Sequence, residues 1–169
     1  MSIVTFVKRV FKVKRNLMRR QYKRVLPMNE LFTDRWEKAR FLGFGDKTSI
    51  YDSSLVFGEV KVGGHTWIGP YTVLDGSGGL EIGSYCSIST GVQIYSHDTV
   101  AWAISGGQKP YSYSKTVIED NCYIAPNVII AKGVRLGKGT IVGANSFVNK
   151  SFPGNCKIAG NPAKIISND

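Results

Sequence analysis

The chain has 169 residues, which is enough for one domain with a hydrophobic core, and its 43% of apolar and 20% of charged residues are typical of a globular protein. Its three cysteines, none in a CxxC pair, exclude a disulfide framework and favour a reducing, cytoplasmic compartment. No apolar run long enough to predict a membrane span is present, and Lys8, Arg9 and Lys12 interrupt the apolar stretch that a secretory signal would need.

The net charge of +10 is concentrated at the N-terminus. Residues 1–40 hold twelve Lys or Arg and three Asp or Glu, a net of +9, whereas the rest of the chain has a net charge of +1. We therefore expect a basic helical arm over residues 1–45 and a nearly neutral domain over residues 46–166.

Residues 2–26 predict an amphipathic helix that ends before Pro27. Its apolar face holds Ile3, Val7, Val10, Leu17, Tyr22 and Val25, and Lys and Arg fill most of the opposite face. Residues 30–41 predict a second, short helix. A nucleic-acid-binding arm needs no apolar face, so we do not expect nucleic acid as a partner. The pattern leaves open contact with an anionic membrane through residues 2–26, or packing on the domain or on a neighbouring subunit.

From Ile50 onward the sequence repeats every six residues. An aliphatic residue begins each of fourteen repeats, at Ile50, Val56, Val62, Ile68, Leu74, Ile82, Ile88, Ile94, Ile118, Ile124, Ile130, Leu136, Val142 and Val148. Two extra residues, read as Leu80 and Glu81, interrupt the frame once. The fifth position of most repeats is small or aliphatic.

A unit of six residues suits one short strand and one turn, because it is too short for a helix and its return. The aliphatic first position points into a narrow interior, and three units close a triangular coil that stacks on the next by parallel strand pairing. We therefore predict an all-β solenoid of between four and five coils. A β-sandwich does not keep a six-residue frame, which weighs against that alternative.

The repeats break between residues 97 and 117, and this inserted loop is the place to look for a site. Four aromatic residues in or beside the loop are candidates for stacking on a sugar, namely Tyr95, Trp102, Tyr111 and Tyr113. His97 lies at the start of the loop and Asp98 follows it. Asp75 lies three repeats earlier, so it should occupy the same face one coil away, where we expect it to bind an acceptor hydroxyl.

The segment "YIAPNVIIAKGVRLGKGTIVGANSFVNKSFPGNCKIAGNPAKII" resembles the hexapeptide-repeat acyltransferase family, and "AGNPAK" at 159–164 is a strong marker of that family. The resemblance covers about residues 50–166. It implies a left-handed winding of the parallel β-helix, an acetyl-CoA donor, a sugar or polysaccharide-precursor hydroxyl as acceptor, and a homotrimer with the donor bound between subunits.

The same resemblance implies that His97 is the general base that deprotonates the acceptor hydroxyl. Imidazole suits this task because it titrates near neutrality, and Asp98 or another nearby carboxylate would orient the ring. His65 is the only other histidine, and we interpret it as a turn residue. Two histidines are too few for the three-histidine zinc site of a carbonic anhydrase, so we expect no metal.

By position in the family, the pantetheine arm and phosphates of the donor would lie along Ala125, Pro126, Gly143, Ala144, Asn149, Lys150 and Lys164. Pro126 has no N–H to stabilise the oxyanion of the thioester intermediate, so Ala125 or Asn127 would have to donate instead.

Transfer to an amine, on an amino sugar or an antibiotic, is the alternative activity. A non-catalytic binding or structural module that uses the basic arm is the third. Because the arm has an apolar face, we favour its docking at the inner face of the plasma membrane, near lipid-linked glycan assembly.

Overall fold

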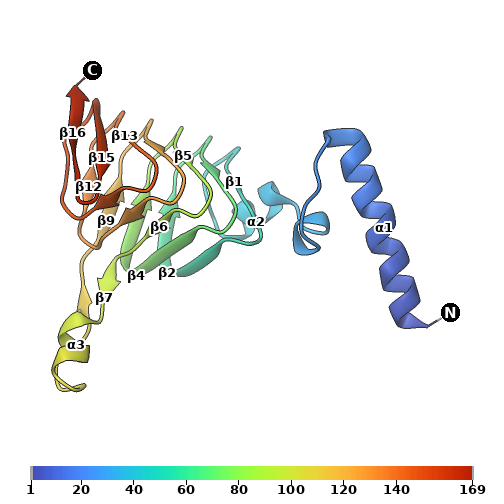
Figure 1. Ribbon diagram of the computed structural model, residues 1–169, viewed down its shortest axis with the longest axis horizontal. Helices are drawn as coiled ribbons and strands as arrows, with labels where there is room; N and C mark the ends of the chain where they lie inside the picture. The colour runs from blue at the N-terminus through green and yellow to red at the C-terminus, as the bar shows by residue number, and fades with distance from the viewer. Residues whose placement is uncertain (1, 169) are drawn as a thin grey trace.

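The computed structural model describes residues 2–168, which form a parallel β-solenoid with a helical arm at its N-terminal end (Figure 1). The helical arm contains α1 (Ile3–Tyr22), the 3-10 helix η1 (Asn29–Leu31) and α2 (Arg35–Phe41). Within the described residues, no helix is both long and apolar enough to cross a membrane.

The first helix is shorter than the predicted span of 2–26. It begins after Ser2, whose hydroxyl accepts from the Thr5 N–H, and it ends at Tyr22 because Lys23 adopts a left-handed conformation with φ of 54°. The predicted second helix is divided into η1 and α2 by a short connection, and Asp34 caps α2 through the N–H groups of its first turn.

The solenoid has three faces of parallel strands. The first face stacks β1 (Ser49–Ile50), β3 (Trp67–Ile68), β5 (Ser87–Ile88), β10 (Tyr123–Ile124), β13 (Ile141–Val142) and β15 (Cys156–Gly160), and β16 (Ala163–Asn168) closes it in antiparallel register. The second stacks the first parts of β2 (Leu55–Val62) and β4 (Val73–Ile82), then β6 (Gln93–Ile94), β11 (Ile129–Ile130) and β14 (Phe147–Val148). The third stacks the second parts of β2 and β4, then β9 (Thr116–Ile118) and β12 (Arg135–Leu136).

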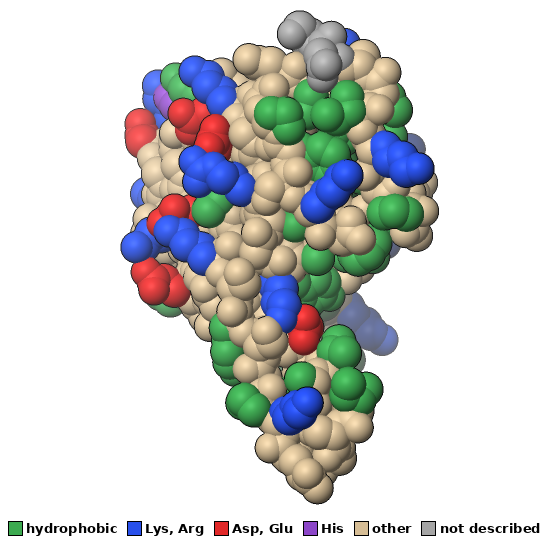
Figure 2. All heavy atoms as spheres, turned by 90° about the vertical axis from the view of Figure 1, so that its left-hand side faces the viewer, with side chains coloured by type: hydrophobic (Ala, Val, Ile, Leu, Met, Phe, Trp, Pro, Cys, Tyr) green, Lys and Arg blue, Asp and Glu red, His purple; other side chains and the backbone are tan. Residues whose placement is uncertain are grey.

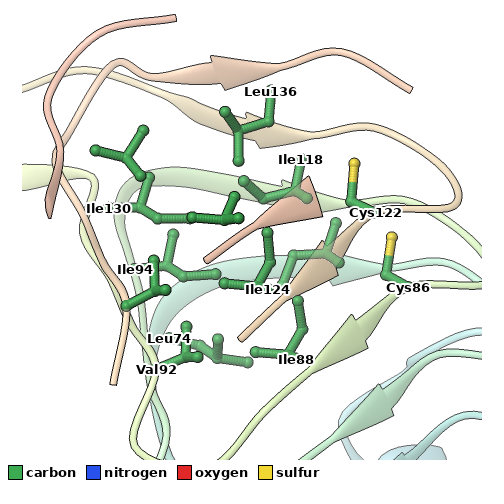
Figure 3. Close-up of a cluster of buried hydrophobic side chains, with 14 of the residues drawn as sticks. Leu74, Cys86, Ile88, Val92, Ile94, Ile118, Cys122, Ile124, Ile130 and Leu136 are labelled. Atoms are coloured by element: carbon green, nitrogen blue, oxygen red, sulfur yellow. The ribbon is translucent and has the colours of Figure 1, made fainter. Parts of the chain in front are cut away.

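The repeat pattern builds the core as predicted. Ile68 pairs with Ile88, and Ile88 pairs with Ile124, so equal positions of successive coils stack in register. Thirteen of the fourteen first positions are buried, and Figure 3 shows several of them, among them Ile88, Ile94 and Ile124, pointing into the interior. The exception is Val56, which is half-buried in the first complete coil.

The two extra residues lie slightly earlier than the sequence suggested. Gly58 pairs with Gly76 and Val60 pairs with Leu80, so the additional length falls within residues 77–79. Leu80 is 1% exposed and takes the inward fifth position. The expectation that Leu80 and Glu81 are the inserted pair was therefore wrong. The resulting bulge lies at the corner between the second and third faces.

A hairpin arm leaves the same corner one coil later and projects from the body of the molecule (Figures 1 and 2). It consists of β7 (His97–Asp98), α3 (Val100–Ile104) and β8 (Ser112–Tyr113), and β7 and β8 pair antiparallel. The chain rejoins the solenoid at Thr116, where β9 begins, two residues before the predicted restart at Ile118.

Candidate active site

His97 stands at the base of the hairpin arm and is held by a buried carboxylate. Its Nδ1 lies 2.5 Å from Oδ2 of Asp75, which comes from the preceding coil at the same corner. The Asp75 side chain is 2% exposed, whereas the His97 side chain is 29% exposed. The pair therefore has a buried acidic end and an accessible imidazole end.

Asp75 is fixed as a carboxylate by its surroundings. Burial raises its pKa, but donors from the Ser77 hydroxyl, the Ser96 N–H and the His97 ring more than offset this and lower the pKa to about 2. Ser77 donates from both its hydroxyl and its backbone to Oδ1, and Ser96 donates to Oδ2. An ionised carboxylate only accepts hydrogen bonds, so Nδ1 of His97 carries the proton, and in the neutral imidazole the lone pair is then on Nε2.

Neither Asp75 nor Asp98 makes the contact first expected of it, although a nearby carboxylate does hold the ring. Asp75 is buried and both its oxygens are engaged, by Ser77, Ser96 and His97, so its carboxylate is not free to bind an acceptor hydroxyl in this structure. Asp98 does not contact the imidazole through its carboxylate. Its Oδ2 lies 2.8 Å from Nζ of Lys132, which lowers the pKa of Asp98, and its Oδ1 accepts from the Val100 N–H. Adjacent residues of a strand point to opposite sides, which explains why His97 faces Asp75 whereas Asp98 faces Lys132.

Lys132 is a residue at this site that the sequence interpretation missed. Its ammonium contacts Asp98 on the outgoing strand β7 and the Ser112 hydroxyl on the returning strand β8. Because Ile130 pairs with Ile94, Lys132 lies one coil beyond Ser96 at the same corner. One side chain of the solenoid thus ties both strands of the hairpin arm to the coil beneath them.

A hollow of about 460 Å³ lies beside the histidine. Its lining comes from the His97 corner and the outer surface of the second face, namely Tyr95, His97, Asp98, Thr99, Val100, Ile129, Ala131, Lys132 and Phe147. Of the four predicted sugar-stacking residues, only Tyr95 lines this hollow, and its hydroxyl donates to Gln93.

The other three aromatic residues form a chain of ring contacts along the arm. The Tyr113 and Tyr111 ring centroids lie 5.9 Å and 6.5 Å from that of His97, and Trp102 meets Tyr111 edge-on at 5.7 Å. All three are more than a third exposed, so their outer surfaces are available to a ligand or a partner.

The residues expected along the donor do not share one corner. Ala125, Pro126, Gly143 and Ala144 follow strands of the first face, and the Asn145 N–H links these two turns through the Pro126 carbonyl at 3.0 Å. Asn149 and Lys150 follow β14, at the corner that also carries Lys132. Lys164 lies in β16, where the solenoid is closed.

The two backbone donors expected to replace Pro126 are already engaged. The Ala125 N–H donates to the Val142 carbonyl at 3.0 Å, and the Asn127 N–H donates to the Thr90 carbonyl at 3.0 Å. Both bonds belong to the ladder that joins successive coils. Neither N–H is therefore free to stabilise an oxyanion in this structure. Within residues 2–168, no cluster of three or more His, Cys, Asp or Glu is placed to hold a metal ion.

The chain is similar to known transferases. A model of the bacterial transferase hexapeptide family (six repeats) matches residues 115–150. No curated protein is significantly similar to the chain in sequence. Among solved structures, AntD, an N-acyltransferase from Bacillus cereus in complex with dTDP and 3-hydroxybutyryl-CoA, is 26% identical, with a TM-score of 0.67 over 74% of this chain and 71% of its own.

Two further structures share the fold at lower identity. A maltose O-acetyltransferase from Clostridium difficile 630 is 24% identical, with a TM-score of 0.62 over 97% of this chain and 84% of its own. A hexapeptide-repeat acetyltransferase from Vibrio cholerae O1 biovar eltor, complexed with acetyl coenzyme A, is 20% identical, with a TM-score of 0.59 over 95% and 87% of the two chains.

Stacked three-sided coils and these similarities define the class as the left-handed parallel β-helix of hexapeptide repeats. Within that class the chain is similar to hexapeptide-repeat acyltransferases, and two of the similar proteins were solved with a coenzyme A thioester bound. The acceptor is a separate question, which depends on the His97 corner.

Proposed function

We propose that the protein transfers an acyl group, acetyl in the first instance, from coenzyme A to a sugar hydroxyl, with His97 as the general base. The observation that carries this proposal is the buried Asp75 carboxylate on Nδ1 of His97. In the neutral imidazole this contact directs the lone pair to Nε2, which is the atom that would abstract the hydroxyl proton.

The chemistry needs one base and no covalent enzyme intermediate. Nε2 of His97 removes the hydroxyl proton as the acceptor oxygen attacks the thioester carbonyl carbon. The resulting tetrahedral intermediate collapses, the C–S bond breaks, and the thiolate of coenzyme A takes the proton back from the imidazolium. Asp75 stabilises the imidazolium that exists between these two proton transfers.

An oriented base favours a hydroxyl over an amine as the acceptor. A neutral amine attacks a thioester without prior deprotonation, whereas a sugar hydroxyl is a poor nucleophile until it loses its proton. N-acylation of an amino sugar or a nucleotide-linked amino sugar remains the second candidate. The 26% identity to AntD, an N-acyltransferase solved with dTDP, favours it.

The remaining parts of the proposal concern the donor and the assembly. Asn149 and Lys150 are the donor-binding candidates closest in the coil order to His97, and Lys150 places its ammonium 5.5 Å from the Phe152 ring centroid. Donor binding between subunits would make the active form a homotrimer working in the cytoplasm, with polysaccharide biosynthesis as the setting. Sedimentation of the purified protein would test the trimer directly.

Two matched histidine substitutions test the general-base role. His97→Asn should lower kcat with acetyl-CoA and a hydroxyl acceptor by about 10²–10⁴-fold, because the base is lost. His65→Asn is the control, since His65 occupies the same position of its repeat but stacks on Tyr85 at 4.6 Å between ring centroids. Asparagine tolerates the left-handed φ of 56° found at His65. Equal activity of the two variants would rule out His97 as the base.

A panel of acceptors decides between hydroxyl and amine. The acceptors would be sugars that differ only in a hydroxyl or an amino group at one carbon, each measured with the wild type and with His97→Asn. We expect transfer to the hydroxyl to depend steeply on His97. Transfer to the amine alone, with little loss in the variant, would support the second candidate.

A further inference from the structure

Helix α1 contacts η1, where Met18 and Tyr22 line a hollow together with Glu30, and most of the rest of its apolar face is left uncovered by the described chain. None of its residues is buried, and Figure 1 shows it standing outside the end of the solenoid, beyond α2. Ile3, Phe6, Val13 and Leu17 are between 55% and 82% exposed. Packing of the helix on the end of its own solenoid is therefore not what the structure contains.

The helix divides cleanly into two halves. At about 100° per residue, the aliphatic and aromatic side chains fall within one half of the helix circumference, and six of its seven cations fall in the other half. The exception is Lys14, whose ammonium reaches over the Phe32 ring at 5.9 Å. Residues 2–26 contain no Asp or Glu.

A shallow apolar hollow of about 360 Å³ runs along the exposed half. Phe6, Val10, Val13 and Leu17 form it, and the cations Arg9 and Lys14 stand at its edges. Long cationic side chains can lay their methylenes along apolar surface while the charged group stays in water. This is the arrangement that suits an interface with apolar material below and negative charge at the rim.

Charge decides what covers this face. Two copies of a helix with seven cations and no acid repel each other, which disfavours a helix pair between chains. A nucleic acid would use the cations but would leave Phe6, Val13 and Leu17 exposed to water. An anionic phospholipid bilayer matches both halves, since its acyl region receives the apolar side chains and its phosphates face the cations.

We propose that α1 docks on the surface of an anionic phospholipid bilayer, with its apolar half in the interface and its axis parallel to the membrane plane. The solenoid and the His97 corner then remain in water. Docking would hold the enzyme beside membrane-linked acceptors. The proposal does not depend on the identity of the acceptor or on the acyl transfer itself.

Vesicle sedimentation with the full chain tests the proposal. The wild type should pellet with vesicles of phosphatidylcholine and phosphatidylglycerol, remain in the supernatant with phosphatidylcholine alone, and bind less at high salt. The variant Phe6→Ser/Leu17→Ser should bind the anionic vesicles at least about tenfold more weakly, because two inserted side chains are lost. Phe41→Ser is the matched control, since Phe41 is 83% exposed but lies on α2. It should bind like the wild type.

A second variant separates the two halves of the helix. Lys12→Gln/Arg19→Gln should weaken binding to anionic vesicles by about fivefold or more for each charge removed at low salt. Circular dichroism of each variant verifies that the solenoid is folded, which we expect because no substituted residue of α1 is buried.

Two results would overturn the proposal. The first is a wild type that stays in the supernatant with anionic vesicles. The second is vesicle binding that is unchanged in Phe6→Ser/Leu17→Ser and is displaced by duplex DNA, which would identify a nucleic-acid arm. Because the readout is sedimentation, a failure here leaves the acyltransferase proposal standing, and the reverse also holds.

Discussion

The two histidines of this chain occupy the same position of their repeats and have different surroundings. His65 is exposed, adopts a left-handed backbone conformation and stacks on the Tyr85 ring. His97 begins a strand of the hairpin arm and donates from Nδ1 to the buried carboxylate of Asp75. The repeat fixes where each histidine stands, but the neighbouring coil decides whether its ring is held by a buried carboxylate.

The difference arises from irregularities in the solenoid. At His65 the coils stack regularly, with Tyr85 at the equivalent position of the next coil and its N–H on the Gly64 carbonyl. At His97 the bulge at 77–79 brings Ser77 onto Asp75 and the Gly78 N–H onto the Ser96 hydroxyl at 2.8 Å. Departures from the repeat therefore create the polar cluster that a regular coil excludes.

The largest effect should come from removing the carboxylate that distinguishes His97 from His65. Asp75→Asn should lower kcat by about 100-fold or more, because the imidazole loses both its preferred tautomer and the charge that stabilises its protonated form. KM for the donor should change little, which is a result that general misfolding would not give. Steady-state kinetics with both substrates varied provides the measurement. An unchanged kcat would show that the Asp75 contact has no role in catalysis.

Acid should abolish the difference in the free energy of unfolding between Asp75→Asn and the wild type. The pKa of Asp75 is lowered from 3.8 to about 2 in the folded protein. The unfolded chain then binds a proton first as the pH falls, so the stabilisation is complete above about pH 4 and is lost as the pH approaches 2. It amounts to something on the order of 2 kcal/mol.

Urea unfolding of the wild type and Asp75→Asn at a series of pH values between 6 and 2.5 measures this. We expect the two free energies of unfolding to converge as the pH falls, since the wild type loses its advantage. Parallel curves would mean that the carboxylate is not held ionised by Ser77, Ser96 and His97.

The core was predictable from the sequence because it depends on one physical rule applied fourteen times. Each first-position residue such as Ile88 or Ile124 must be aliphatic to fill a narrow interior, so the sequence carries the signal directly. The position of the extra residues was not predictable to the residue. Counting from Leu74, Gly78 is the fifth residue of its repeat, and Leu80 takes that place only if the two extra residues come before it. The pairing of Val60 with Leu80 shows that Leu80 occupies the inward fifth position.

The site was predictable in part, for a related reason. Counting repeats placed Asp75 on the same face as His97 one coil away, but not the direction of its side chain or its burial. Assigning the orienting role to Asp98 relied on adjacency in sequence, which strand geometry makes a poor guide. The inserted loop hid the coil relation between Ser96 and Lys132, because its length breaks the count.

Lys132 offers the sharpest comparison between a site residue and a repeat residue. Lys132 and Lys138 occupy the same position of consecutive repeats, but only Lys132 reaches the hairpin arm, through Asp98 and Ser112. Lys132→Met should lower kcat by about tenfold, because the two strands that carry His97 and Tyr113 lose their tie to the solenoid. Lys138→Met should leave kcat unchanged, since Lys138 is exposed at a corner away from the arm.

The cause of the loss at Lys132 can be separated from a direct role in binding substrate. If Lys132 positions the arm, Lys132→Arg should recover part of kcat by restoring the ion pair with Asp98, and Asp98→Asn should reproduce much of the loss seen in Lys132→Met. If Lys132 instead contacts the donor or acceptor, Lys132→Met should raise KM and Asp98→Asn should be nearly silent. Combining Asp98→Asn with Lys132→Met distinguishes the two, because residues acting through one ion pair give a double variant little worse than either single one.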